Sequence, residues 1–230
     1  MEASDFTFVL VGNFEPEKIK PWVEQYIGGL PGMNRKESYK DLGIEAPAGI
    51  TKKVVKAGSD PKSMVSITIP GEFEYSEQNV YEMNAMLSVL RIMLRENMRE
   101  EKGGVYGVGA NGRAASYPRK GYRVDINFGC APERVDELIG AVWTEIKKLK
   151  AEGASEKNLQ KVQEIDRRSR ETDLQSNEWW QNTLKHLQMD GISIAELDKY
   201  NSWVDGLTSA KIAELAKKYL KEDHYIQVVL

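Results

Sequence analysis

The sequence predicts an α+β fold of two layers, in which helices pack on one face of a mainly antiparallel sheet. The first observation behind this is the order of the patterns along the chain, which is β-β-α-β-β-α-α-α-β. Strands that follow one another in pairs favour an antiparallel or mixed sheet over a doubly wound parallel one. The second is the composition, since an apolar fraction of 41% and a charged fraction of 29% are ordinary for a globular protein.

Two strands and a long helix open the main body of the fold. Residues 52–57 and 64–69 are β-rich runs separated by the turn Gly58-Ser-Asp-Pro61, so both are predicted to be strands. Ser76 is a residue type preferred at helix N-caps. Apolar residues then recur every three or four positions, which predicts a helix that reaches Lys102.

A hairpin, further helices and a closing strand come next. Residues 105–114 and 122–128 are predicted to pair around the turn at 117–121. Pro132 is placed to start the next helix and Gly153 to stop it. The remaining predicted elements are a helical region over 155–189, a helix from the cap Thr208 to Leu220, and a strand over 225–230.

The first residues of the chain have a different organisation. Residues 6–11 are a short apolar run that predicts a buried strand, and a helix should follow from Pro16 to about Tyr26. The next stretch is rich in proline and glycine. We therefore expect a strand–helix tail of a preceding repeat domain over 1–30, a linker over 31–47 and the main domain over 48–230.

Composition and charge exclude several classes of function. The formal net charge is −3, so the chain lacks the basic surface of a nucleic-acid-binding protein. No run approaches the ~20 apolar residues that span a bilayer, and the N-terminus lacks the pattern of a signal peptide. Cys130 is the only cysteine, which excludes an internal disulfide and leaves the redox compartment open.

The residues that usually carry chemistry are sparse. His186 and His224 are the only histidines, and neither H-x-x-E-H nor H-E-x-x-H occurs. A catalytic zinc usually needs three protein ligands, so no self-contained zinc site is expected. His186 is interpreted as a helix-surface or partly packed residue, His224 as a loop residue, and Cys130 as a small buried apolar residue.

Three further patterns have structural interpretations. Gly107-Val-Gly-Ala-Asn-Gly112 spells G-x-G-x-x-G but runs through a predicted strand instead of opening a helix, so it is rejected as a dinucleotide site. Its glycines are expected to mark a bulge or the close approach of another backbone. The charged run at 166–171 is interpreted as a solvated helix face. At least one of Trp179 and Trp180 is expected to lie in the core.

The segment Met98-Arg-Glu-Glu-Lys-Gly-Gly-Val-Tyr-Gly-Val-Gly-Ala110 closes the long helix, turns on two glycines and opens a strand. That geometry would aim Arg99 and Tyr106 at one place. In one interpretation Arg99 pairs with Glu96 or Glu100 on the surface, and Tyr106 is an ordinary strand aromatic. In the other, the guanidinium and the phenol bind a peptide carbonyl and stabilise an oxyanion beside a metal held by another domain.

The stretch Leu94-Arg-Glu-Asn-Met-Arg-Glu-Glu-Lys-Gly-Gly-Val-Tyr106 resembles the R-E-…-G-G-x-Y segment in the C-terminal half of pitrilysin/insulinase zinc metallopeptidases. This family has bacterial members and includes the mitochondrial processing peptidase. Residues 6–31 are similar to the strand and helix that end one repeat of that family, and residues 217–230 to its closing helix and strand. The resemblance covers essentially the whole chain, and the Arg-to-Tyr segment is its specific part.

The resemblance implies a bi-lobed peptidase of four related domains around a chamber, with H-x-x-E-H in the first domain and an arginine–tyrosine pair in the last. Arg99 would orient the substrate backbone, Tyr106 would hydrogen-bond the scissile carbonyl or its tetrahedral intermediate, and Gly103 and Gly104 would shape the turn between them. The zinc, its water and the glutamate base are expected in the missing N-terminal half. This chain alone is expected to hydrolyse nothing.

The expected partners are the N-terminal half of the same peptidase, or a zinc-bearing partner subunit, and a peptide substrate. Two alternatives stay open: a non-catalytic subunit or scaffold of the same fold in a hetero-oligomeric complex, and an unrelated α+β binding module. The compartment is open as well, since a bacterial periplasm or cell envelope and a cytoplasm are all compatible with the sequence.

Overall fold

The computed structural model describes residues 3–34, 38–101, 103, 105 and 107–230. The contacts between residues divide the chain into two compact units. The larger unit comprises residues 43–167 and 197–230, and the smaller unit comprises residues 1–42 and 168–196. Each unit is described by itself.

A five-stranded mixed sheet forms one layer of the larger unit, with the order β1-β5-β2-β4-β3. β1 and β5 are parallel, and every other pair is antiparallel. The mainly antiparallel α+β fold predicted from the sequence is therefore confirmed. The strands are β1 (Ile50–Val54), β2 (Ser63–Glu72), β3 (Val108–Ala115), β4 (Gly121–Cys130) and β5 (Tyr225–Val229).

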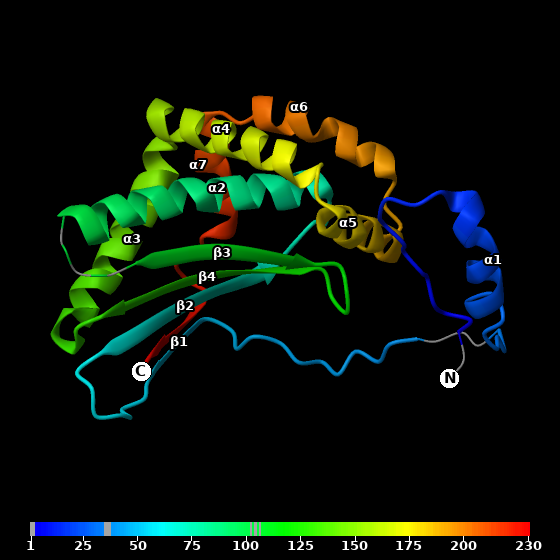
Figure 1. Ribbon diagram of the computed structural model, residues 1–230. Helices are drawn as coiled ribbons and strands as arrows, with labels where there is room; N and C mark the ends of the chain where they lie inside the picture. The colour runs from blue at the N-terminus through cyan, green and yellow to red at the C-terminus, as the bar shows by residue number, and fades with distance from the viewer. Residues whose placement is uncertain (1–2, 35–37, 102, 104, 106) are drawn as a thin grey trace. The chain divides into compact units, whose positions relative to one another are not determined.

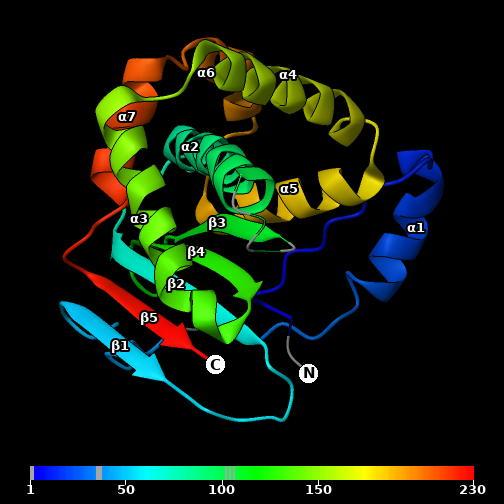
Figure 2. The ribbon, with the colours of Figure 1, turned by 90° about the vertical axis from the view of Figure 1, so that its left-hand side faces the viewer.

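Helices form the other layer, and α2, α3 and α7 cover one face of this sheet (Figures 1 and 2). Ser76 caps α2 as predicted, because its Oγ accepts a hydrogen bond from the backbone N–H of Asn79 at 3.1 Å. Thr208 caps α7 in the same way through the N–H of Lys211. The helices are α2 (Glu77–Arg95), the π-helix η1 (Glu96–Glu101), the 3₁₀ turn η2 (Pro132–Arg134), α3 (Val135–Glu152), α4 (Glu156–Asp173), the 3₁₀ segment η3 (Ile194–Lys199), α6 (Tyr200–Asp205) and α7 (Ser209–Tyr219).

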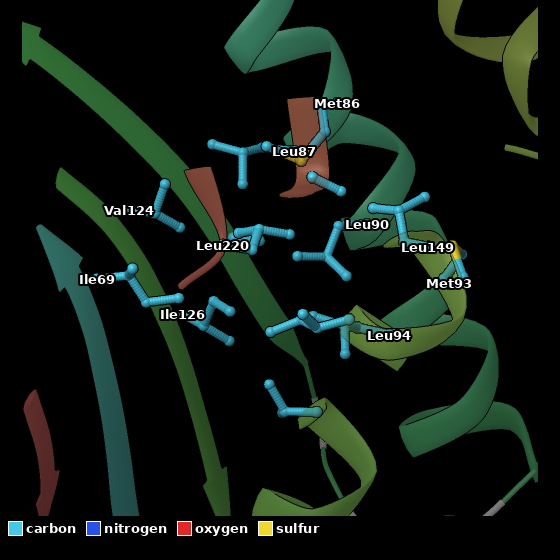
Figure 3. Packing of buried hydrophobic residues seen from close by; sticks show 14 of the residues in the cluster. Ile69, Met86, Leu87, Leu90, Met93, Leu94, Val124, Ile126, Leu149 and Leu220 are labelled. Carbon is cyan, nitrogen blue, oxygen red and sulfur yellow. The ribbon is translucent and has the colours of Figure 1, made fainter. Parts of the chain in front are cut away.

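The hydrophobic core fills the space between the sheet and these helices. Alternate residues of β2 and β4 point into it, and the side chains from α2, α3 and the end of α7 meet them there (Figure 3). Figure 3 labels Ile69, Val124 and Ile126 on the strands, and Met86, Leu87, Leu90, Met93, Leu94, Leu149 and Leu220 on the helices and the end of α7. The period of two along the strands and of 3.6 along α2 thus gives one continuous apolar layer.

The smaller unit contains α1 (Pro16–Tyr26) and α5 (Asn177–Asp190). The helix predicted from Pro16 is confirmed, but the buried strand predicted over residues 6–11 is wrong. In the described part of the chain no strand pairs with this segment, and the side chain of Phe6 is 52% exposed. A strand needs a neighbouring strand to pair its N–H and C=O groups, and none of the described residues supplies one.

The predicted helical region over 155–189 is two helices, because residues 174–176 break it. Ser176 caps the second helix by accepting a hydrogen bond from the N–H of Trp179 at 3.2 Å. Trp179 and Trp180 meet edge to face at 5.0 Å between ring centroids, and both are only half-buried. The expectation that one of them is a core residue is therefore wrong. Over the described residues, no helix is long and apolar enough to cross a membrane.

Candidate functional site

Arg99 lies on η1, the wider turn that continues α2, and its side chain is exposed. Glu100, a partner considered for it, lies 3.9 Å from Arg95. Among the residues that the structure describes, Arg99 itself has no ion pair. The neighbouring Met98 is fully buried, so the backbone of this turn is anchored while the guanidinium faces solvent. This geometry leaves Arg99 available to a ligand.

The turn after η1 contains Gly103, whose φ is +57°. This left-handed conformation favours glycine, because a side chain there would be strained. The chain then returns to the core at Val105, which is buried. Gly104 and Tyr106 lie outside the described residues. The predicted convergence of Arg99 and Tyr106 therefore stays a prediction, as does the role of the two glycines in a substrate site.

A pocket of about 610 Å³ adjoins this turn. It is lined by Gly103 and Val105, and also by the start of β2, the end of β4 and the beginning of the next helix. Cys130 lies in its wall, and burial raises the pKa of the thiol. A thiol that resists ionisation is a poor nucleophile, so the interpretation of Cys130 as a small buried residue is confirmed.

The two histidines have ordinary surroundings. Nδ1 of His186 lies 2.9 Å from Oδ2 of Asp190 on the surface of α5, and Nε2 of His224 lies 3.2 Å from the carbonyl oxygen of Pro47. In the part of the chain that the structure describes, no group of three or more His, Cys, Asp or Glu side chains could hold a metal ion. The His, Cys, Asp and Glu side chains of the described residues are therefore not arranged to hold a zinc ion.

The G-x-G-x-x-G motif lies along β3, as predicted, and not at the start of a helix. A Cβ at Gly112 would lie 2.7 Å from Cδ1 of Leu87 and 2.9 Å from Cε of Met83. This glycine therefore lets α2 pack closely on the sheet. The close approach expected here exists, but it is made by side chains of the core, not by another backbone.

Sequence reasoning missed the environment of Asp166. Tyr81 donates a hydrogen bond to its Oδ2 at 2.9 Å, and Tyr200 donates one to its carbonyl oxygen at 3.3 Å. Burial raises the pKa of the Asp166 carboxyl. The interpretation of 166–171 as a solvated face is therefore wrong for its first residue. The missed signal is the spacing of four residues that places Asp166 on the same face as the buried Val162.

Comparison with known proteins agrees with this architecture. Residues 1–165 match the family model described as the Peptidase M16 inactive domain. The chain belongs to this family. The resemblance to pitrilysin/insulinase zinc peptidases is thereby confirmed, and so is the assignment of the chain to the inactive, C-terminal type of domain in that family.

The curated relatives of this M16 domain are much longer than the domain itself. It is 27% identical over 195 residues to a zinc protease PQQL-like protein of Arabidopsis thaliana, covering 78% of this chain and 20% of that protein. It is 25% identical to the probable zinc protease PqqL of Escherichia coli K12, covering 94% of this chain and 23% of that protein. The chain thus spans about a fifth to a quarter of the relatives it matches.

Solved structures show the same fold. The periplasmic protease PqqL of Escherichia coli matches with a TM-score of 0.79 at 22% identity, over 95% of this chain and 24% of that one. A protease from Helicobacter pylori matches with a TM-score of 0.81 at 14% identity, over 96% of this chain and 54% of that one. The first half of the same PqqL also matches, with a TM-score of 0.69 at 11% identity over 95% of this chain and 49% of that one. The fold therefore occurs in the first half of that peptidase.

Proposed function

We propose that this chain is the part of a zinc metalloendopeptidase that completes the peptide-binding chamber and supplies Arg99 and Tyr106 to an active site whose zinc is held by another part of the protein. The observation that supports this most is the state of Arg99. It is an exposed guanidinium on an anchored turn, with no ion pair among the described residues. The alternative of a surface ion pair with Glu96 or Glu100 finds no support there.

The chemistry of the two side chains fits this role. A guanidinium has five N–H donors in a rigid fork and binds a peptide carbonyl without a change of protonation. Tyr106 would add one O–H donor to the carbonyl oxygen as it becomes an oxyanion. Such preorganised donors act on the charge that develops in the transition state and not on the ground state. This chain would therefore contribute to turnover while it holds no metal of its own.

The partner we propose is the N-terminal half of the same peptidase, which the greater length of the relatives supports. Residues 6–11 would be the point of attachment. Phe6, Phe8 and Leu10 alternate along this extended segment and are each 45% or more exposed. An apolar alternation without a sheet favours a strand that pairs in a preceding domain. Residues 1–30 would then belong to that domain, and 48–230 to the next.

The test is the turnover of a quenched fluorescent peptide by the full-length parent carrying Arg99→Ala. Loss of one donor to an oxyanion typically costs ~10²–10³ in rate, and we expect kcat to fall by that order while the thermal midpoint is unchanged. The matched control is Arg91→Ala, since Arg91 is an exposed arginine on the preceding helix. Equal kcat in both variants would rule out the role of Arg99.

A second arm separates the peptidase from a scaffold of the same fold. This chain is assayed with zinc, alone and mixed with the zinc-bearing half of the parent. Hydrolysis only in the mixture is the expected result. Hydrolysis by the chain alone would contradict the assignment of the metal to the other half. A mixture that associates without hydrolysing the peptide library would favour a non-catalytic subunit.

A further inference from the structure

Strand β1 (Ile50–Val54) forms one margin of the sheet, and among the described residues only β5 pairs with it (Figure 2). The other edge of β1 carries backbone N–H and C=O groups that no described strand pairs. We propose that this edge binds an extended, acidic segment of another polypeptide chain, which adds to the five-stranded sheet as a further strand. This proposal is independent of the role of Arg99 and Tyr106.

The register of β1 decides which of its backbone groups face outward. The carbonyl oxygen of Gly49 accepts a hydrogen bond from β5 at 3.2 Å, and the N–H of Val55 donates one to β5 at 2.8 Å. In a strand the N–H and C=O of one residue point to the same side, and this side alternates from residue to residue. The odd-numbered residues from 49 to 55 therefore pair with β5. Ile50, Lys52 and Val54 direct their N–H and C=O groups away from the sheet.

The aliphatic side chains of β1 are exposed although they lie on the helix side of the sheet. Ile50 is next to Tyr225 in the ladder and Val54 is next to Val229, and both β5 residues are buried. Ile50 is nevertheless 52% exposed and Val54 is 65% exposed. The helix layer thus covers β5 and leaves β1 open. An exposed apolar edge strand is a template on which another strand can pair.

Two lysines determine which strand this edge accepts. Lys52 lies between the two aliphatic residues on the helix side, Lys53 lies on the opposite side, and both are exposed. In the part of the chain that the structure describes, neither lysine forms an ion pair. Like charges directly opposite each other in a sheet are destabilising, whereas opposite charges attract. A second copy of this chain is therefore disfavoured, because β1 against β1 would set lysine against lysine, and a strand with a carboxylate is favoured.

The order of the side chains gives the sequence pattern of the ligand. An added antiparallel strand would place alternate residues opposite Ile50, Lys52 and Val54. Apolar residues would pack on the two aliphatic side chains, and an Asp or Glu between them would pair with Lys52. The pattern is apolar-x-acidic-x-apolar. The main-chain hydrogen bonds of such an added strand supply affinity, and its alternate side chains supply specificity.

The test uses the 230-residue chain and two end-blocked peptides, Thr-Val-Thr-Glu-Thr-Val-Thr and the same peptide with a central lysine. Titration is followed by backbone amide NMR. We expect the acidic peptide to bind at least ~5-fold more tightly, because an opposite-charge pair replaces a like-charge pair. Equal affinity of the two peptides, or no shift in β1, would overturn the proposal.

Hydrogen exchange identifies strand addition. At saturation with the acidic peptide, amide exchange should slow most at Ile50, Lys52 and Val54, whose N–H groups face outward before binding. Thr51 and Lys53 should change less, since the register already pairs their N–H groups with β5. Protection without this alternation would overturn the assignment of the ligand to the edge of β1.

A charge exchange localises the contact. In Lys52→Glu the preference should reverse, so that the lysine peptide binds at least ~5-fold more tightly than the acidic one. The matched control is Lys161→Glu, which makes the same change of net charge on the exposed surface of α4 and should keep the original preference. Far-UV circular dichroism confirms that each variant is folded. An unchanged preference in folded Lys52→Glu, or a reversal in Lys161→Glu, would overturn the proposal.

Sedimentation of the chain without peptide tests a second copy as the occupant. We expect a monomer in which the outward-facing amides of β1 exchange rapidly. A dimer with slow exchange at Ile50, Lys52 and Val54 would show that another copy covers the edge, and would overturn the proposal. All these measurements are made without a peptidase assay, so failure of the role proposed for Arg99 would leave their outcome unchanged.

Discussion

Gly112 and Gly109 lie on the same strand, yet their replacement by alanine should change stability in opposite directions. At Gly112 the new methyl group would meet Leu87 and Met83 at 2.7 and 2.9 Å, closer than carbon atoms normally approach. Both side chains are fully buried, so they have little room to move. At Gly109 the nearest atoms lie at 3.5 and 3.9 Å, which is ordinary contact.

The magnitudes follow from two opposing effects. Overpacking a core typically costs about 1–3 kcal/mol, whereas replacing glycine by alanine at a compatible backbone stabilises by about 0.4–1 kcal/mol through the unfolded chain. Neither glycine has a positive φ. We expect Gly112→Ala to lower the free energy of unfolding by about 1–2 kcal/mol. Gly109→Ala should raise it by up to about 1 kcal/mol.

The assay is urea unfolding of the chain, followed by fluorescence and circular dichroism. All variants are fitted with the same dependence of the unfolding free energy on urea concentration (the m value). A double variant identifies the cause, because Leu87→Ala removes the atom that the new methyl group would meet. Gly112→Ala should cost less in that background than in the native one, and the coupling energy measures the clash. Equal effects of the two glycine variants, or no coupling with Leu87, would refute the assignment of this motif to helix–sheet packing.

Two other predictions concern polar contacts. The Tyr122 hydroxyl donates a hydrogen bond to the carbonyl oxygen of Tyr219 at 2.8 Å inside the core. Tyr122→Phe should therefore lower the free energy of unfolding, measured in urea, by about 1–3 kcal/mol. No loss of stability would show that water replaces this hydrogen bond. The hydrogen bond from Lys150 lowers the pKa of Glu222 from its ordinary value of 4.5. This contribution to stability is therefore present above pH 4.5 and is lost as the pH falls through the lower folded value. Glu222→Gln should flatten the part of the stability profile below about pH 4.5, and an unchanged profile would contradict it.

The period of the apolar residues predicted most of the larger unit. β2 alternates as Val65, Ile67 and Ile69, and the caps at Ser76 and Thr208 are where their residue types predict them. These features are local, so the sequence carries them. The order of the strands is not local. β5 lies between β1 and β2, because strand pairing across most of the chain length depends on the packed core and not on any turn signal.

Periodicity misled the prediction where burial depended on distant partners. Residues 6–11 have the composition of a strand, but a strand exists only when another strand pairs with it. Asp166 has the composition of a surface residue, but Tyr81 and Tyr200 reach it from α2 and α6. In both cases the prediction fits the segment taken alone, and it fails because the outcome depends on other parts of the chain. For Asp166, the two tyrosines that decide the outcome lie 85 and 34 positions away in the sequence, beyond the reach of any local pattern.

The π-helix η1 shows most clearly the limit of a repeat of 3.6 residues as a predictor. The prediction ran one regular helix to Lys102, whereas the turn from Glu96 to Glu101 has i→i+5 hydrogen bonds. Each extra residue in a turn rotates the subsequent residues by about 100° relative to a regular helix. The direction of Arg99 is therefore set by this turn and not by the apolar stripe of α2. Because Glu96 and Asn97 of the same turn line a pocket of about 400 Å³, the π-helix also sets the direction of these two side chains. Deleting Met98, the residue between Asn97 and Arg99, should restore a regular helix. It should disturb both the direction of Arg99 and the lining of the pocket.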